Sequence, residues 1–113
     1  MKKTYPNSII HECNDGFIHS APAATFQPNG LGLYDMLGNV AEWCENVAGS
    51  SGSPSSPNPN RLVNSGQPDR VYRGGSWRNE PDKVRCADRT VADPVFRRPG
   101  LGFRLVRLES AAP

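Results

Sequence analysis

Hydrophobic and polar residues alternate along several short stretches of the chain, and a period of two predicts strands. In residues 39–46, one face of the predicted strand carries Val40 and Cys44, and the other carries Trp43. In residues 102–108, both faces carry apolar side chains, which is typical of a strand covered on each side. The strands predicted from these stretches span residues 39–46, 70–77, 84–89 and 102–108.

The intervening segments predict turns and loops. Asn29 and Gly30 indicate a turn, and residues 31–38 predict one or two helical turns that end at Gly38. The prolines of 78–83 and 90–100 predict irregular surface loops. We therefore expect a loop-rich α+β fold with short antiparallel strands.

A further segment, residues 49–60, contains only Gly, Ser, Pro and Asn, with no apolar side chain to bury. It predicts a flexible loop inside a single domain of residues 1–113, and an insertion is the favoured explanation.

Composition limits the size of the core. The chain has 113 residues, of which 36% are hydrophobic, and it contains 11 Gly and 11 Pro. These values predict one small domain with a small core. No apolar run reaches the roughly 20 residues that cross a bilayer, and no apolar segment of a signal peptide follows Met1–Lys3. We expect no membrane partner and, by default, a cytoplasmic location, since nothing else in the sequence indicates a compartment.

Charge is divided unevenly between the two halves of the chain. Residues 1–60 carry two basic and five acidic side chains, whereas residues 61–113 carry ten Arg, one Lys and six acidic side chains. Such a basic half could bind nucleic acid. However, its arginines interleave with carboxylates, which favours internal ion pairs, and it lacks a lysine stripe and a platform for stacking bases. Nucleic-acid binding is therefore not expected.

The three cysteines are Cys13, Cys44 and Cys86. They are too few and too far apart for a disulfide framework or a C-x-x-C metal site. Two alternatives stay open: one disulfide plus one free thiol, or three free thiols. His11 and His19 raise the further alternative of a thiol nucleophile, but no local motif supports it.

Four segments in register resemble a known family. They are residues 32–43 (GLYDMLGNVAEW), 73–77 (RGGSW), 85–89 (RCADR) and 102–106 (GFRLV). In this order they resemble the C-terminal half of the formylglycine-generating-enzyme-like family, also called the sulfatase-modifying-factor domain, over residues 16–108. The resemblance implies a C-type-lectin-like fold. Because the family domain is about twice as long as this chain, the resemblance also implies that the fold is truncated.

The same resemblance implies a structural calcium ion. Its ligands would be the backbone carbonyls of Leu37, Gly38 and Val40 and the carboxylate of Glu42, which suit the preference of calcium for oxygen. The alternative is that Glu42 pairs with an arginine inside the fold. Arg104 lies in a predicted buried strand and needs a carboxylate partner, for which Glu42 and Asp88 are the candidates.

We do not expect the catalytic chemistry of the family in this chain. Formylglycine-generating enzymes use a cysteine pair between the Gly-Gly-Ser bend and the Arg-Cys-Ala strand, but residues 77–84 contain no cysteine. Thiolates are the ligands that hold Cu(I), so copper is not expected. Cys86 matches a cysteine that is structural in the enzymes. His11 and His19 do not reproduce the iron-binding motif of another branch of the superfamily.

We therefore expect a non-catalytic module that binds a protein or a small-molecule ligand through surface loops. A specific version is a variable protein of a diversity-generating retroelement. The alternatives are the back half of a formylglycine-generating-type oxidoreductase acting on protein or small-molecule thiols, and a fragment completed by a complementary chain. The candidate ligand-binding residues are Arg78, Asn79, Glu80, Asp82, Lys83, Thr90, Val91, Asp93, Val95, Phe96 and Arg97.

Overall fold

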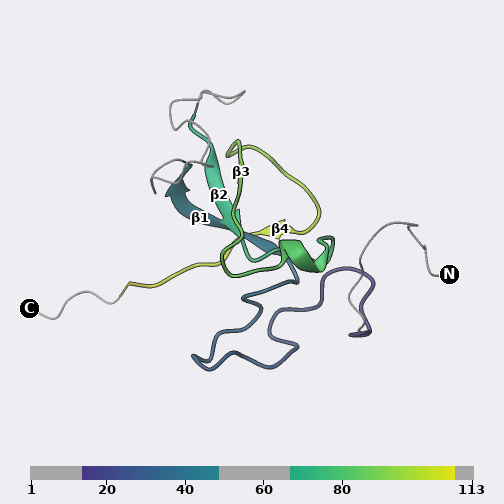
Figure 1. Cartoon of the computed structure of the whole chain (residues 1–113). Coiled ribbons are helices and arrows are strands. Elements are labelled where there is room, and N and C mark those ends of the chain that lie inside the picture. The colour runs from purple at the N-terminus through teal and green to yellow at the C-terminus, as the bar shows by residue number, and fades with distance from the viewer. Residues whose placement is uncertain (1–13, 49–66, 109–113) are drawn as a thin grey trace, which may run out of the picture.

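The computed structural model describes residues 14–48 and 67–108. Within them a small, curled sheet carries the fold, and long loops surround it (Figure 1). The predicted flexible loop at 49–60 lies outside the described residues, as do Cys13 and His11. No helix in the described part of the chain is long and apolar enough to cross a membrane.

The sheet has four strands in the order β3-β2-β1-β4. Strand β1 (Ala41–Val47) pairs antiparallel with β2 (Arg70–Arg73), which pairs antiparallel with β3 (Thr90–Ala92). The short strand β4 (Leu101–Gly102) lies on the other side of β1 and runs parallel to it, so one pairing departs from the antiparallel expectation. A 3-10 helix, η1 (Pro81–Lys83), interrupts the loop after β2.

Several predictions of local structure are confirmed. Strand β1 occupies the alternating stretch at 39–46, and β2 occupies the first part of 70–77. The turn predicted at Asn29 is also present. Its carbonyl accepts a hydrogen bond from the Gly32 N–H, and its side chain accepts one from the Leu33 N–H.

Other predictions of local structure are wrong. Residues 84–89 form a turn instead of a strand, and β3 lies in the next stretch, which was expected to be a loop. Residues 31–38 form bends without a helix, because the side chain of Asn29 accepts hydrogen bonds from the N–H groups of Leu31 and Leu33 and thereby competes with helical hydrogen bonds. The strand predicted at 102–108 ends at Gly102, since no described segment pairs with the residues that follow.

The core is as small as the composition predicts. Among the described residues, its buried apolar members are Ala41, Ala48, Val71 and Tyr72. The ring of Trp43 meets that of Tyr72 edge to face at 5.5 Å, which extends this core over β1 and β2.

Two glycines after β2 allow the chain to turn sharply. Gly74 and Gly75 have φ values of +91° and +66°, a region that L side chains rarely adopt. A Cβ added to Gly75 would lie 2.9 Å from Cγ2 of Val84 and 3.2 Å from the Lys83 carbonyl oxygen. In the sequence, two adjacent glycines suit a bend or a close backbone approach. Both are present here, and the end of η1 lies against the bend.

Candidate functional site

The two loops that contain most of the candidate ligand-binding residues, 78–83 and 93–100, meet at a tight junction that follows β2. Ser76 is buried there, and both its N–H and its hydroxyl donate hydrogen bonds to Oδ1 of Asn79, at 2.9 and 2.7 Å. The other loop, residues 93–100, returns to the same point. A Cβ added to Gly100 would lie 3.0 Å from Oγ of Ser76 and 3.5 Å from the indole nitrogen of Trp77.

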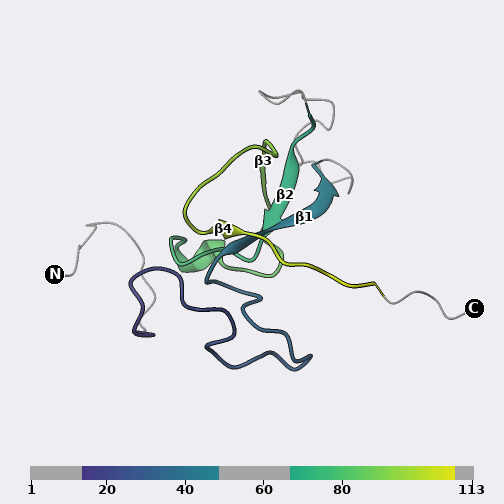
Figure 2. The ribbon, with the colours of Figure 1, turned by 180° about the vertical axis from the view of Figure 1, so that it is seen from behind.

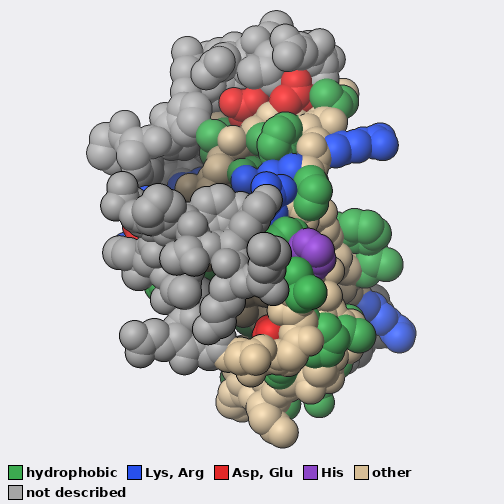
Figure 3. Space-filling model, turned by 90° about the vertical axis from the view of Figure 1, so that its right-hand side faces the viewer, with side chains coloured by type: hydrophobic (Ala, Val, Ile, Leu, Met, Phe, Trp, Pro, Cys, Tyr) green, Lys and Arg blue, Asp and Glu red, His purple; other side chains and the backbone are tan. Residues whose placement is uncertain are grey.

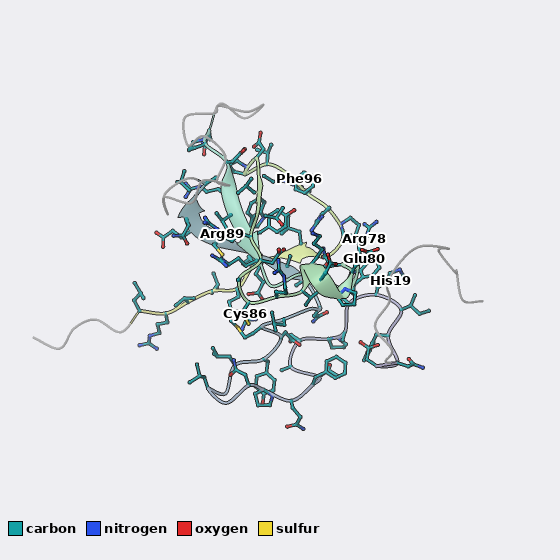
Figure 4. All side chains as sticks on the ribbon, in the orientation of Figure 1. His19, Arg78, Glu80, Cys86, Arg89 and Phe96 are labelled. Carbon is teal, nitrogen blue, oxygen red and sulfur yellow. The ribbon has the colours of Figure 1, made fainter. Side chains whose placement is uncertain are left out.

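Away from the junction, the loops present their side chains to solvent. Arg78 and Glu80 lie beside η1, and Phe96 lies on the other loop, apart from them (Figure 4). Asp82 and Lys83 contact each other at 3.5 Å and are both well exposed. The candidate residues that the structure leaves exposed are Arg78, Glu80, Asp82, Lys83, Thr90, Val95, Phe96 and Arg97.

The other three candidates are half-buried and take part in local structure. The side chain of Asn79 holds Ser76, as described above. Val91 lies on β3 opposite Val71 of β2. The carboxylate of Asp93 accepts a hydrogen bond from the Val95 N–H, which shapes the start of the loop. Their contacts assign these residues to the support of the loops, whereas the exposed candidates form the accessible surface.

The structure also brings His19 to this region, which sequence reasoning did not anticipate. Its ring packs edge to face on Trp77 with centroids 4.7 Å apart, and the guanidinium of Arg78 lies 5.5 Å from the Trp77 ring centroid. A cavity of about 310 Å³ opens beside them, with Asp15, Asp35 and Phe26 in its wall. In the space-filling view the described histidine lies at the surface among hydrophobic side chains (Figure 3). Because His19 and Trp77 are 58 positions apart in the sequence, no local pattern could reveal this contact.

The cysteines do not form a catalytic arrangement within the described residues. Cys44 and Cys86 are free thiols, and Cys86 is exposed. Figure 4 shows Cys86 on the opposite side of the ribbon from His19. The positions of Cys86 and His19 therefore give no support to a thiol nucleophile that His19 activates.

A bidentate ion pair fixes the chain around β1. Arg104 donates from Nε and Nη2 to the two carboxylate oxygens of Glu42, both at 2.7 Å. Its Nη2 also donates to the backbone carbonyls of Tyr34 and Asp35, at 2.9 and 3.4 Å. The hydrogen bonds to Glu42 raise the pKa of Arg104 above its ordinary value; burial opposes this, and the charges of Glu42 and Asp35 add to it. The expectation that Arg104 needs an acidic partner is confirmed, and the partner is Glu42.

One of the four predicted calcium ligands, Glu42, is a member of this pair, and the other three precede it in the chain. Asn39, between Gly38 and Val40, is held on both sides. Its carbonyl accepts from the Trp77 N–H, and its amide side chain exchanges two hydrogen bonds with the backbone of Ala21. An ionised carboxylate offers about four acceptor positions, of which Arg104 uses two on Glu42. Two acceptor positions of the Glu42 carboxylate therefore stay available for another partner. No cluster of three His, Cys, Asp or Glu side chains occurs in residues 14–48 and 67–108.

Comparisons with known proteins give a consistent result. A family model described as the sulfatase-modifying factor enzyme 1-like domain matches residues 1–109. The formylglycine-generating enzyme of Mus musculus is 38% identical over 93 residues, which cover 80% of this chain and 25% of that protein. The inactive C-alpha-formylglycine-generating enzyme 2 of the same species is 34% identical over 99 residues, covering 82% of this chain and 28% of that protein.

A further relative is the serine/threonine-protein kinase pkn1 of Chlamydia pneumoniae. It is 39% identical over 90 residues, which cover 74% of this chain and 14% of that protein. The chain therefore spans between about a seventh and somewhat more than a quarter of these relatives.

Proposed function

We propose that this chain, which belongs to the family of sulfatase-modifying factor enzyme 1-like domains, is a non-catalytic binding domain on a C-type-lectin-like scaffold. The observation that carries this proposal is the contrast between the junction and the loop tips. Ser76, Asn79 and Gly100 are in close contact, whereas most side chains of the two loops face solvent. Rigidly rooted loops with exposed tips are where proteins place ligand-binding residues.

Family membership alone does not decide between binding and catalysis. One relative is named an enzyme and another is named inactive. The residues of this chain favour binding, because the stretch between Trp77 and Val84 contains Arg78 and Lys83 but no thiol. A copper-dependent oxidase would have no soft ligand at this place.

A ligand screen with matched variants tests the proposal. Arrays of synthetic glycans and of synthetic peptides are probed with the wild-type chain and with a variant that replaces Arg78, Glu80, Phe96 and Arg97 by alanine. We expect at least one probe to bind the wild type and not the variant, while the two proteins unfold at the same temperature. A control variant, Arg107→Ala at an exposed position outside both loops, should bind like the wild type and so separates local from general loss of charge. Absence of binding, or equal binding by the wild type and the four-residue variant, would contradict the proposal.

Oxygen consumption tests the enzymatic alternative directly. The chain is incubated with Cu(I) and a cysteine-containing peptide, and the mouse formylglycine-generating enzyme serves as the positive control. We expect no consumption above the background that copper alone gives. Copper-dependent consumption that disappears in a Cys86→Ser variant would instead favour the oxidoreductase.

The version that involves a diversity-generating retroelement makes a separate prediction. Sibling copies of the gene should then differ at exposed loop positions such as Arg78, Glu80 and Phe96, and should agree at Gly75 and Ser76. Loops that are uniform across sibling copies would exclude this version and leave the binding proposal in place.

The proposal includes a calcium ion bound by the carbonyls of Leu37, Gly38 and Val40 and by Glu42. Such an ion would tie the segment before β1 to the strand itself. The donor chemistry supports it, and Arg104 competes with it for the carboxylate. Replacing Arg104 by Met should therefore strengthen calcium binding, as measured by titration calorimetry, if the ion binds at this place.

A further inference from the structure

The cavity beside the histidine is built from three segments that are far apart in the sequence: residues 15–26, 35–39 and 76–84. Both ribbon views show the segment before β1 looping below the sheet on the side of η1 (Figures 1 and 2). The amide side chain of Asn39 exchanges two hydrogen bonds with the backbone of Ala21, and its carbonyl accepts one from the Trp77 N–H at 3.0 Å. Hydrogen bonds therefore join all three segments around the cavity. Its volume of about 310 Å³ is sufficient for a small organic molecule.

Rings form part of the cavity wall. Phe26 lines it and packs edge to face on Phe17, with centroids 6.2 Å apart. His19 and Trp77 line it as well, and Leu37 adds aliphatic surface. Ligand pockets bind the apolar part of a ligand through side chains of these kinds. The wall therefore favours a ligand with an aromatic or apolar body.

The charged side chains in the lining are of one sign. Among the described residues that line the cavity are Asp15 and Asp35, but no Lys or Arg, although the whole chain has a formal net charge of +2. Asp15 accepts a hydrogen bond from the Phe17 N–H at 3.0 Å, and Asp35 accepts one from the Ala24 N–H at 2.8 Å. Because a carboxylate offers about four acceptor positions, both keep acceptors for a further donor. A cationic donor complements this charge.

Two arginines near the cavity have partners of their own. The guanidinium of Arg78 lies over the ring of Trp77, and Arg78 is not among the lining residues. Arg104 donates to the backbone carbonyl of Asp35 at 3.4 Å, but its charge is matched by the bidentate pair with Glu42. Neither arginine is thus paired with a carboxylate of the cavity.

Backbone strain is concentrated at the same place. In the described part of the chain, the non-glycine residues with positive φ are Ala24, Asp35 and Asn39, at +60°, +53° and +56°. Asp35 and Asn39 line the cavity, and the Ala24 N–H binds the Asp35 carboxylate. Asp and Asn tolerate this region, whereas Ala rarely adopts it, because its Cβ crowds a carbonyl oxygen. Strain of this kind is concentrated at functional sites in proteins.

We propose that this cavity binds a small molecule that carries a primary ammonium group on an aromatic or apolar body. The half-buried Asp35 accepts hydrogen bonds from the ammonium group, Asp15 adds a second negative charge, and the body packs against the rings of the wall. A metal ion fits less well, because no cluster of three His, Cys, Asp or Glu side chains occurs within residues 14–48 and 67–108. The lining contains none of the four loop residues that the glycan and peptide screen replaces, so the inference does not rest on the loops binding a ligand.

Titration calorimetry of the full chain with three matched probes tests the inference. The probes are phenethylamine, phenethyl alcohol and phenylpropionate, which share a ring and differ in charge. We expect the amine to bind at least about tenfold more tightly than the alcohol, because a hydrogen bond to a charged group is stronger than a neutral one, and the phenylpropionate anion not to bind. Equal affinity for the amine and the alcohol, or no binding of the amine at millimolar concentration, would overturn the inference.

A fourth probe tests the part that the apolar body plays. The amide of Nα-acetyl-lysine carries a primary ammonium group without an aromatic ring, and it should bind more weakly than phenethylamine. Tighter binding of the lysine derivative would overturn the assignment to a small amine, since the ligand would then be a protein side chain. Calcium that displaces phenethylamine in direct competition would also contradict the inference, because the carboxylates would then form a metal site.

Variants that remove one charge at a time locate the site. Asp35→Asn and Asp15→Asn keep an oxygen for the N–H groups of Ala24 and Phe17, and Asn tolerates the positive φ at position 35. We expect Asp35→Asn to weaken binding of the amine by about tenfold or more and to leave binding of the alcohol unchanged. Glu45→Gln is the matched control, because it removes the same charge from an exposed position on β1 outside the lining. An equal loss in Asp35→Asn and Glu45→Gln would contradict the inference.

Fluorescence shows where the amine binds. The chain contains two tryptophans, so Trp43→Phe leaves Trp77 as the single one and keeps a ring against Tyr72. Phenethylamine should change the emission of this variant with the midpoint found by calorimetry, and an unchanged emission while heat is released would place the ligand elsewhere and overturn the inference. The four-residue loop variant should still bind the amine, whatever the glycan and peptide screen shows. Loss of the amine in that variant would move the ligand to the loops and contradict the inference.

Discussion

Replacing Glu42 by Gln tests the ion pair that joins the segment before β1 to the segment after β4. The change removes the charge and leaves an amide NH₂ facing a guanidinium N–H, so at least one of the two 2.7 Å hydrogen bonds is lost. The side chains of Arg104 and Glu42 are 31% and 24% exposed, which places the pair between a surface and a buried one. A hydrogen bond to a charged group contributes about 1.5–3 kcal/mol, whereas an exposed pair contributes about 0–1 kcal/mol.

We therefore expect Glu42→Gln to lower the free energy of unfolding by about 2 kcal/mol. For a domain of this size that corresponds to a decrease of about 10 °C in the unfolding temperature. The matched control is Asp88→Asn, which removes the more exposed and longer ion pair with Arg85, at 3.3 Å. It should cost less than about 0.5 kcal/mol. Thermal unfolding followed by circular dichroism in EDTA measures both changes without any contribution from calcium.

A double-mutant cycle with Arg104→Met isolates the pair from other effects. In the Arg104→Met background, Glu42→Gln should cost much less than it does in the wild type. Arg104→Met alone should cost at least as much as Glu42→Gln, because it also removes the hydrogen bonds to the carbonyls of Tyr34 and Asp35. Because the pKa of Arg104 is raised in the folded protein, its contribution is complete below its ordinary pKa and is lost only as the pH rises through the folded-state value. The cycle should thus give the same coupling at pH 7 and pH 10. The reasoning is refuted if Glu42→Gln costs no more than Asp88→Asn.

Three further predictions concern the turn, the junction and the metal. Gly75→Ala should lower the free energy of unfolding by about 2–4 kcal/mol, because Gly75 has a positive φ and an added Cβ would contact Val84. At Gly30 an added Cβ meets nothing, so Gly30→Ala should cost under about 0.5 kcal/mol. Urea titration of both variants measures the difference. Asn79→Ala should cost about 1–3 kcal/mol by leaving the buried polar groups of Ser76 unpaired, and a loss no larger than that of an exposed alanine substitution would show that water replaces the amide. Calcium at about one hundred times its dissociation constant should stabilise the wild type by about 2.7 kcal/mol, and an unchanged midpoint would remove the metal from the proposal.

The sequence predicted those parts of the fold that depend on local chemistry. The alternation around Trp43 predicted β1, and the paired glycines at 74 and 75 predicted the bend. The need of Arg104 for an acidic partner predicted its pairing. Each of these predictions rests on one or a few residues whose chemistry restricts the local structure.

The parts that failed depend on long-range partners. Residues 102–108 alternate as a strand should, yet they form one only as far as Gly102, because alternation shows what a strand would bury and not whether a partner strand is present. Similarly, Val91 became part of β3 because Val71 lies opposite it. The contact of His19 with Trp77 joins segments far apart in the sequence, so no period could reveal it.

A single-substitution scan of residues 67–108, scored by resistance to protease, tests the central claim most directly. That claim is that a rigid junction supports loops whose exposed side chains are free for binding. We predict that substitutions at Arg78, Glu80 and Phe96 preserve resistance, whereas those at Gly75 and Ser76 abolish it. Loop positions as sensitive as the junction would show that these side chains serve the fold, and would contradict the account.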